Sequence, residues 1–223
     1  MARSMDEPGY RAGLVDLLGL LSYGELQGFA RLAADAAMAD NLVDQAAMSA
    51  IAVNELRQFE RLRDRLVEIE ADPEAAMTPF VRSIDDFHTS TAPSDWLEGL
   101  VKLYVGDGIA EDFYVEMADF VDEETAALIR SVFKDRGQAD FVVTTVREAI
   151  AEDPRVAGRL ALWGRRLVGE ALSQAQRVAA ERDSLTELLV SGEGGLDLAG
   201  VGELFSRLTS RHAARMEALG LAP

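Results

Sequence analysis

The sequence predicts an all-α protein built around a four-helix bundle, and three observations support this fold class. Apolar residues recur at steps of three and four along most of the chain, which is the period of a helix, and the alternation typical of strands is missing. Ala and Leu are abundant, whereas aromatic residues make up only 7% of the chain. Five of the six prolines, at positions 8, 73, 79, 93 and 154, punctuate the long periodic stretches.

The first two helices are expected to form a hairpin. The first covers about residues 10–39, and the second begins at a cap formed by Asp40 or Asn41 and ends before Asp72-Pro73. Residues 72–93 contain three prolines and the sequence TSTAP. They are predicted to form a long crossover with a helical turn or two.

The third and fourth helices are expected to form a second hairpin, over about residues 94–121 and 122–151, and Pro154 begins a fifth helix that extends to about residue 190. Two hairpins joined by a long crossover are typical of ferritin-like bundles. The sequence SGEGG at residues 191–195 predicts a flexible hinge before a short amphipathic helix. We therefore expect one bundle domain over residues 1–190, and a segment over residues 191–223 whose helix packs on the bundle or on a partner.

Composition excludes several classes of function. The 39 acidic and 22 basic residues give a net charge of -17, which opposes binding to bulk nucleic acid and to anionic membranes. The chain has no Cys and two His, which excludes thiolate chemistry and His-rich zinc sites. A bilayer-spanning run, an apolar signal core and a phosphate loop are also missing, so we expect a soluble, cytoplasmic protein.

Polar residues interrupt the apolar stripes at related places. The second helix has Glu55 and Gln58 in a stripe that also contains Met48, Ile51, Leu62 and Leu66, and the fourth has Asp135 and Gln138 at the same spacing. The first and third helices contribute Glu25 and Asp107. Glu25 and Glu55 are equally far from the turn at Asp40, as are Asp107 and Asp135 from the turn at Val121. Four carboxylates are therefore expected at one level of the bundle, where they must be protonated, paired with cations or coordinated to metal.

These residues resemble the ferritin-like di-iron hydroxylases, and most closely the MiaE-type tRNA hydroxylases. The resemblance covers about residues 20–150 and includes the sequences ELRQFE at 55–60, GD at 106–107, EDF at 111–113, DEE at 122–124 and Asp135-x-x-Gln138. It implies two iron ions held by Glu25, Glu55, Gln58, Asp107, Asp135 and Gln138. It also implies oxygen-dependent hydroxylation of a modified tRNA or of a small molecule.

The chain departs from the family motif at both histidines. The family has Glu-x-x-His twice, whereas this sequence has Gln58 and Gln138 at the two His positions. An amide oxygen is a harder and weaker ligand than imidazole, which disfavours iron(II) relative to other divalent cations. Gln side chains can equally hydrogen-bond the carboxylates in a metal-free polar layer.

Two functions therefore remain open from the sequence, beside metal storage, which needs a large shell that a single chain does not reveal. One is a di-iron monooxygenase with a degenerate site, and the other is a non-catalytic, metal-free protein that acts through binding or dimerisation. We expect a homodimer made by the fifth and tail helices. His88 and His212 are expected to be solvated or to cap helices. If tRNA binds, the phosphate contacts are expected at the basic residues Arg57, Arg61, Arg63, Arg65, Arg165 and Arg166.

Overall fold

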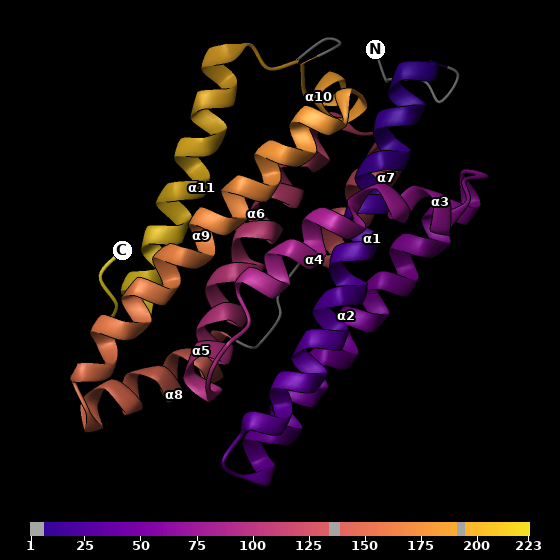
Figure 1. Ribbon diagram of the computed structural model, residues 1–223. Helices are drawn as coiled ribbons and strands as arrows, with labels where there is room; N and C mark the ends of the chain where they lie inside the picture. The colour runs from indigo at the N-terminus through magenta and orange to yellow at the C-terminus, as the bar shows by residue number, and fades with distance from the viewer. Residues whose placement is uncertain (1–6, 134–138, 191–194) are drawn as a thin grey trace.

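The computed structural model describes residues 7–133, 139–190 and 195–223, and over these ranges the chain is helical with no strand (Figure 1). The all-α prediction is confirmed. Within the same ranges, no helix has an apolar stretch of the length needed to cross a bilayer.

The first hairpin consists of α1 (Pro8–Asp35), the short helix η1 (Ala36–Met38) and α2 (Leu42–Glu68), which lie side by side in opposite directions (Figure 1). Asn41 begins α2: its side-chain oxygen accepts hydrogen bonds of 3.0 Å from the backbone N–H groups of Val43 and Asp44. These bonds satisfy two N–H groups that the helix itself leaves without partners. The predicted turn at residue 40 is thereby confirmed.

The crossover contains more helix than the sequence predicts. It forms α3 (Pro73–Met77), η2 (Thr78–Phe80) and α4 (Val81–Ser90). Pro73 and Pro79 each lie in the first turn of a helical segment, where proline removes no intrahelical hydrogen bond. Asp72 caps α3 by accepting a hydrogen bond of 3.0 Å from the Glu74 N–H. The prolines therefore begin helical segments here rather than breaking them.

The third predicted helix contains an irregular turn. Its segments are α5 (Trp96–Val101), the π-helical turn η3 (Lys102–Asp107), α6 (Gly108–Met117) and η4 (Ala118–Phe120). Asp95 caps α5 with a 2.9 Å hydrogen bond from the Glu98 N–H. π-turns are rare and occur frequently at functional sites.

The fourth predicted helix is not described as one continuous helix. Helix α7 (Glu123–Val132) begins at the Asp122 cap and lies against α2, whereas α8 (Ala139–Glu152) lies against α5 and α9. Residues 134–138, between them, lie outside the described part of the chain.

The fifth predicted helix is broken near its end. It consists of α9 (Arg155–Glu181) and α10 (Asp183–Val190), and Arg182 between them leaves the helical conformation. The Arg182 guanidinium donates hydrogen bonds of 3.0 and 2.5 Å to the buried carboxylate of Asp16 on α1. Ser184 Oγ donates to the same carboxylate. A tertiary ion pair thus fixes the place of the break.

The last helix, α11 (Leu198–Ala218), is capped by Asp197 and packs against α6 and α9. Most of the predicted hinge, residues 191–194, lies outside the described residues.

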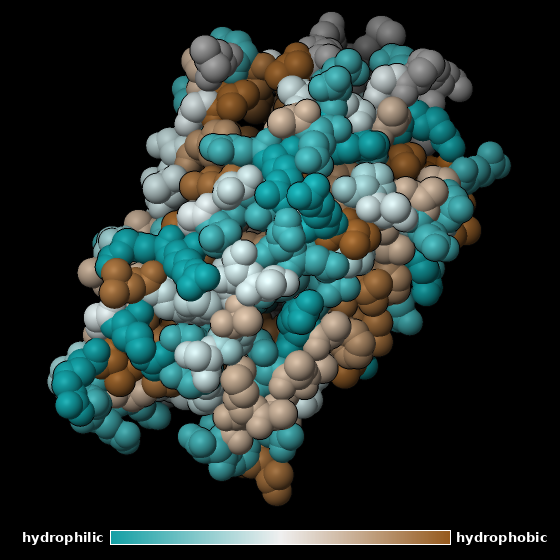
Figure 2. All heavy atoms as spheres, viewed as in Figure 1, coloured by the Kyte–Doolittle hydropathy of each residue, from teal (hydrophilic) through white to brown (hydrophobic). Residues whose placement is uncertain are grey.

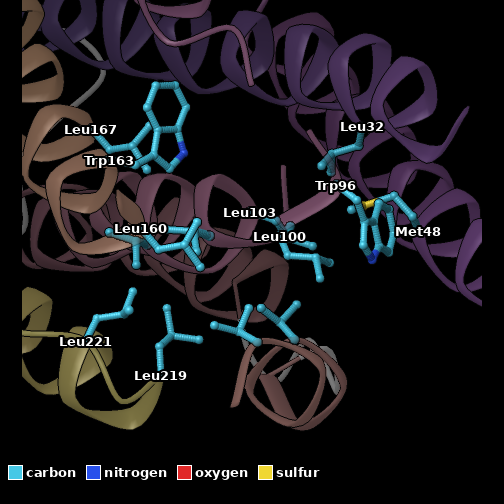
Figure 3. Packing of buried hydrophobic residues seen from close by; sticks show 14 of the residues in the cluster. Leu32, Met48, Trp96, Leu100, Leu103, Leu160, Trp163, Leu167, Leu219 and Leu221 are labelled. Carbon is cyan, nitrogen blue, oxygen red and sulfur yellow. The ribbon is translucent and has the colours of Figure 1, made fainter. Parts of the chain in front are cut away.

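The buried core forms two apolar clusters at opposite ends of the bundle. One includes Trp96, Leu100 and Trp163 and joins the turn end of the first hairpin to α5, α8, α9 and α11 (Figure 3). The other includes Leu18, Leu66 and Ile129 and joins the opposite end of the hairpin to α3, α6, α7 and α10. Among the predicted polar residues, Glu25, Glu55 and Gln58 are buried on α1 and α2 between the stretches of these helices that belong to the two clusters.

Candidate functional site

A buried polar layer divides the two apolar clusters, and we define it by Glu25, Glu55 and Gln58. On α1, Glu25 lies between Leu21 of one cluster and Leu32 of the other. On α2, Glu55 and Gln58 interrupt the stripe from Met48 to Leu66, and all of its predicted members are buried. The prediction that these three polar side chains face inward is therefore confirmed.

Two glycines on α1 allow other side chains to approach the helix beside Glu25. A β-carbon at position 28 would lie 3.2 Å from Glu55 Oε2, and one at position 24 would lie 3.1 Å from the Tyr114 hydroxyl oxygen. Both distances are tighter than ordinary van der Waals contact. Gly24 and Gly28 thus let the Glu55 carboxylate and the Tyr114 hydroxyl reach the helix that carries Glu25.

The Gln58 amide is used to bind α7. Its Nε2 donates a 3.0 Å hydrogen bond to the carbonyl oxygen of Val132, the last residue of that helix. Carbonyls in the last turn of a helix have no intrahelical partner, so a buried amide donor there removes a desolvation cost. Gln58 therefore holds the end of α7 against α2.

Asp107 lies at the end of the π-turn η3 and is half-buried. Its negative charge acts on Lys102 in the same turn and favours the charged form of the Lys102 ammonium. The Lys102 ammonium is buried, donates a 2.8 Å hydrogen bond to the Thr91 carbonyl oxygen and lies 5.5 Å from the centre of the Phe87 ring. Burial lowers the pKa of Lys102 to about 8, although the charges of Asp107 and Asp35 act in the opposite direction.

The structure corrects the expectation that both histidines are solvated or capping. His88 on α4 and His212 on α11 are buried, and the Nδ1 atom of each has no hydrogen-bond partner among the described residues. Burial lowers the pKa of both, that of His88 to about 3, with the nearby charge of Lys102 adding to the effect. Neither His88 nor Lys102 was singled out as a site residue from the sequence, although a lysine within the apolar run GLVKLYV was a usable signal.

Part of the predicted metal site lies outside the described residues, since Asp135 and Gln138 fall within 134–138. In the ranges that are described, no three His, Asp or Glu side chains come together as a group that could hold a metal ion. Glu25 and Glu55 are brought to the polar layer, whereas Asp107 does not complete a three-carboxylate group with them. Glu25, Glu55, Gln58 and Asp107 each make at least one further interaction, so none of them is without a partner.

Comparison with known proteins agrees with this arrangement of helices. Residues 8–192 match the family described as the ferritin-like domain of actinomycetes. The chain belongs to this family. The match includes both helical hairpins and the polar layer of the ferritin-like domain and ends before α11. A search of curated proteins gave no match.

Proposed function

We propose that this ferritin-like protein is non-catalytic and acts by binding, with a polar layer maintained by its own side chains instead of a pair of iron ions. The observation that carries the proposal is the hydrogen bond from Gln58 Nε2 to the Val132 carbonyl oxygen. Gln58 stands where the resembling hydroxylases have a metal-binding histidine. Here its amide has a structural role at the end of α7.

The donor set of the described residues does not fit a di-iron centre. Imidazole, the nitrogen ligand of such bundles, is absent from the layer, because His88 and His212 lie on α4 and α11. Asp107 interacts electrostatically with the buried Lys102 ammonium, and a cation of this kind offsets part of the charge of a carboxylate without a metal ion. A carboxylate layer that has protein partners needs no cofactor to be stable.

A di-iron hydroxylase of the MiaE type is the second candidate function. It is favoured by the burial of Glu25 and Glu55 on facing helices and by the π-turn that carries Asp107. In that case Glu25, Glu55, Gln58, Asp107, Asp135 and Gln138 would hold two iron ions. Bound iron would supply oxygen activation for a modified-tRNA or small-molecule substrate.

Metal-dependent thermal unfolding separates the two functions. Protein from iron-supplemented cells is unfolded by heat in three separate samples, which contain a chelator, anaerobic iron(II) or manganese(II). Its iron content is measured in parallel. Metal at 100 times its dissociation constant would raise the free energy of unfolding by about 2.7 kcal/mol. We expect no metal-dependent change in melting temperature and no stoichiometric iron.

A matched pair of variants controls this measurement. Glu55→Gln changes the polar layer, whereas Glu60→Gln makes the same chemical change at an exposed position of the same helix. If the wild-type and Glu60→Gln proteins are stabilised by iron(II) and the Glu55→Gln protein is not, the layer binds metal and the proposal is wrong.

A further inference from the structure

The exposed residues of the first hairpin are uncharged in one half of α2 and mostly charged in the other half. Over the first half of α2 the exposed residues carry no charge: they are Leu42, Val43, Gln45, Ala46, Ser49, Ala50 and Val53. Over the second half, five of the six exposed residues are charged: they are Arg57, Glu60, Arg61, Asp64, Val67 and Glu68. The outer surface of α2 is therefore uncharged near the turn, where five of the seven exposed residues are apolar, and charged at the other end.

The adjoining part of α1 continues the apolar surface. Its exposed residues include Ala30, Ala33 and Ala34, and Ala37 is exposed in the following helix η1. We call the exposed residues of segment 30–53 the tip face. In Figure 2, tan and brown residues gather over this end of the hairpin, and Figure 1 shows the turn projecting past α5. Leu42 and Val43 are 81% and 78% exposed at its edge.

The charges of the tip face suit a second copy of this chain. The molecule has a net charge of -17, so two copies repel each other at most approaches. Among the fourteen exposed residues of segment 30–53, the charged ones are Arg31 and Asp40, which have opposite signs. The fully exposed residues of the face therefore carry no net charge, and the half-exposed Asp44, which accepts a hydrogen bond from Asn41, adds one carboxylate at its edge. A two-fold axis can place Arg31 of each copy near Asp40 of the other.

The size and shape of the tip face also suit self-association. An interface of standard size takes about 800 Å² and roughly 20–30 residues from each partner, so fourteen exposed residues suit a smaller interface whose dimer dissociates on dilution. Alanines at helical spacing on two adjacent helices allow close approach of another helix pair. Helix α11, in contrast, is packed on its own bundle through α6 and α9.

We propose that the tip face is the interface of a homodimer in which two copies pair their α1–α2 hairpins about a two-fold axis. This places the dimer contact on the first hairpin instead of the fifth and tail helices. The interface is independent of metal binding, so the melting experiments on Glu55 and the association experiments described next can fail separately.

Sedimentation velocity of the full chain over a range of concentrations tests the proposal. The wild-type protein is expected to be a dimer that dissociates on dilution. The double variant Leu42→Glu/Val43→Glu places four carboxylates in the interface and is expected to weaken dimerisation at least about 100-fold, because like charges are brought together. Carboxylates in the first turn of a helix are favourable, so the variant should keep its fold, as measured by circular dichroism.

Val67→Glu and Leu162→Glu are the controls, at exposed positions on the second half of α2 and on α9; each adds one carboxylate, and the two combined add as many as the tip-face double variant. Both are expected to leave the dimer intact, singly and combined. If the tip-face double variant does not fold, Ala37→Lys tests the same face from η1. A monomeric wild-type protein, a dimer that survives the tip-face variants, or a dimer that either control dissociates equally would overturn the proposal.

Discussion

His88 and Lys102 are buried basic residues whose pKa values burial lowers, to about 3 and about 8. In the unfolded chain the same groups titrate near 6.5 and 10.5. The unfolded state therefore binds more protons than the folded state between pH 3 and 6.5 for His88, and between pH 8 and 10.5 for Lys102. In both windows stability falls as the pH falls, because protons favour the state that binds them.

We expect His88→Phe to reduce the loss of stability in acid. Between pH 6.5 and about 4, the His88→Phe protein takes up one fewer proton on unfolding than the wild type. The slope of its free energy of unfolding against pH is therefore lower by up to about 1.4 kcal/mol per pH unit. Urea unfolding of both proteins at pH 7.5, 6.5, 5.5 and 4.5 measures this difference. Thr89→Phe, which changes an exposed neighbour on α4, should retain the wild-type slope. If the free energy of unfolding of the wild type and of His88→Phe changed equally with pH, the loss of stability in acid would not be due to His88.

At the residue scale, the sequence predicts which side chains face inward but not what they bind there. Helical spacing on α2 correctly identifies the buried stripe that contains Glu55 and Gln58, because burial follows directly from the period. The partner of the Gln58 amide depends on where α7 ends, and the role of Lys102 depends on the position of Thr91 in the crossover. These partners are 74 and 11 residues away in sequence. Such pairings are set by tertiary packing, which the local pattern does not determine.

Helix α11 is held to α6 by a ladder of ion pairs. Arg207 and Arg211 approach Glu116 at 2.7 and 3.0 Å, and Arg215 approaches Asp112 at 2.6 Å. Both carboxylates are largely buried, and the hydrogen bond from Arg207 lowers the pKa of Glu116. Partly buried pairs of this kind are screened less by salt than exposed ones.

We expect Glu116→Gln to loosen α11 without unfolding the bundle. Losing the charge that two arginines share should cost about 1–2 kcal/mol, which corresponds to a roughly 5- to 30-fold larger equilibrium constant for opening of the helix. Hydrogen exchange of the α11 amides, compared with those of α1, measures this change. Asp119→Asn removes an exposed pair with Arg130 and should have little effect. If the α11 amides were equally protected from hydrogen exchange in the Glu116→Gln and Asp119→Asn proteins, apolar packing alone would hold the helix.

Element boundaries were predicted where local chemistry sets them and missed where distant contacts do. The caps at Asn41, Asp95 and Asp122 satisfy N–H groups two or three residues ahead, so the sequence alone indicates them. The break at Arg182 follows an ion pair with Asp16, 166 residues away, and gives no local signal. Prolines in the crossover were misread as breakers because the sequence does not distinguish a first-turn proline from one that ends a helix.

The net charge of -17 predicts weak interaction of the whole molecule with nucleic acid. The basic residues predicted to contact phosphates have partners within the protein. Arg65 is buried and bridges Glu68, Asp122 and Glu124. Arg165 binds the carbonyl oxygens of Ala222 and Pro223, and Arg166 binds that of Ser90. Arg65 is therefore not available to displace counterions from a phosphate backbone, whereas Arg165 and Arg166 are exposed and have neutral partners that leave their charge in place.

We expect binding to bulk tRNA to be weaker than about micromolar at physiological salt, since a protein of net charge -17 releases few counterions. A hydroxylase of the resembling family would instead recognise one splayed-out modified base by stacking and shape, which depends less on the overall field. Titration of modified and unmodified anticodon stem-loops at two salt concentrations separates these cases. Weak binding of both loops agrees with the non-catalytic function. Tight binding of the modified loop alone would favour the hydroxylase, and tight, steeply salt-dependent binding of the unmodified loop would contradict the argument from charge.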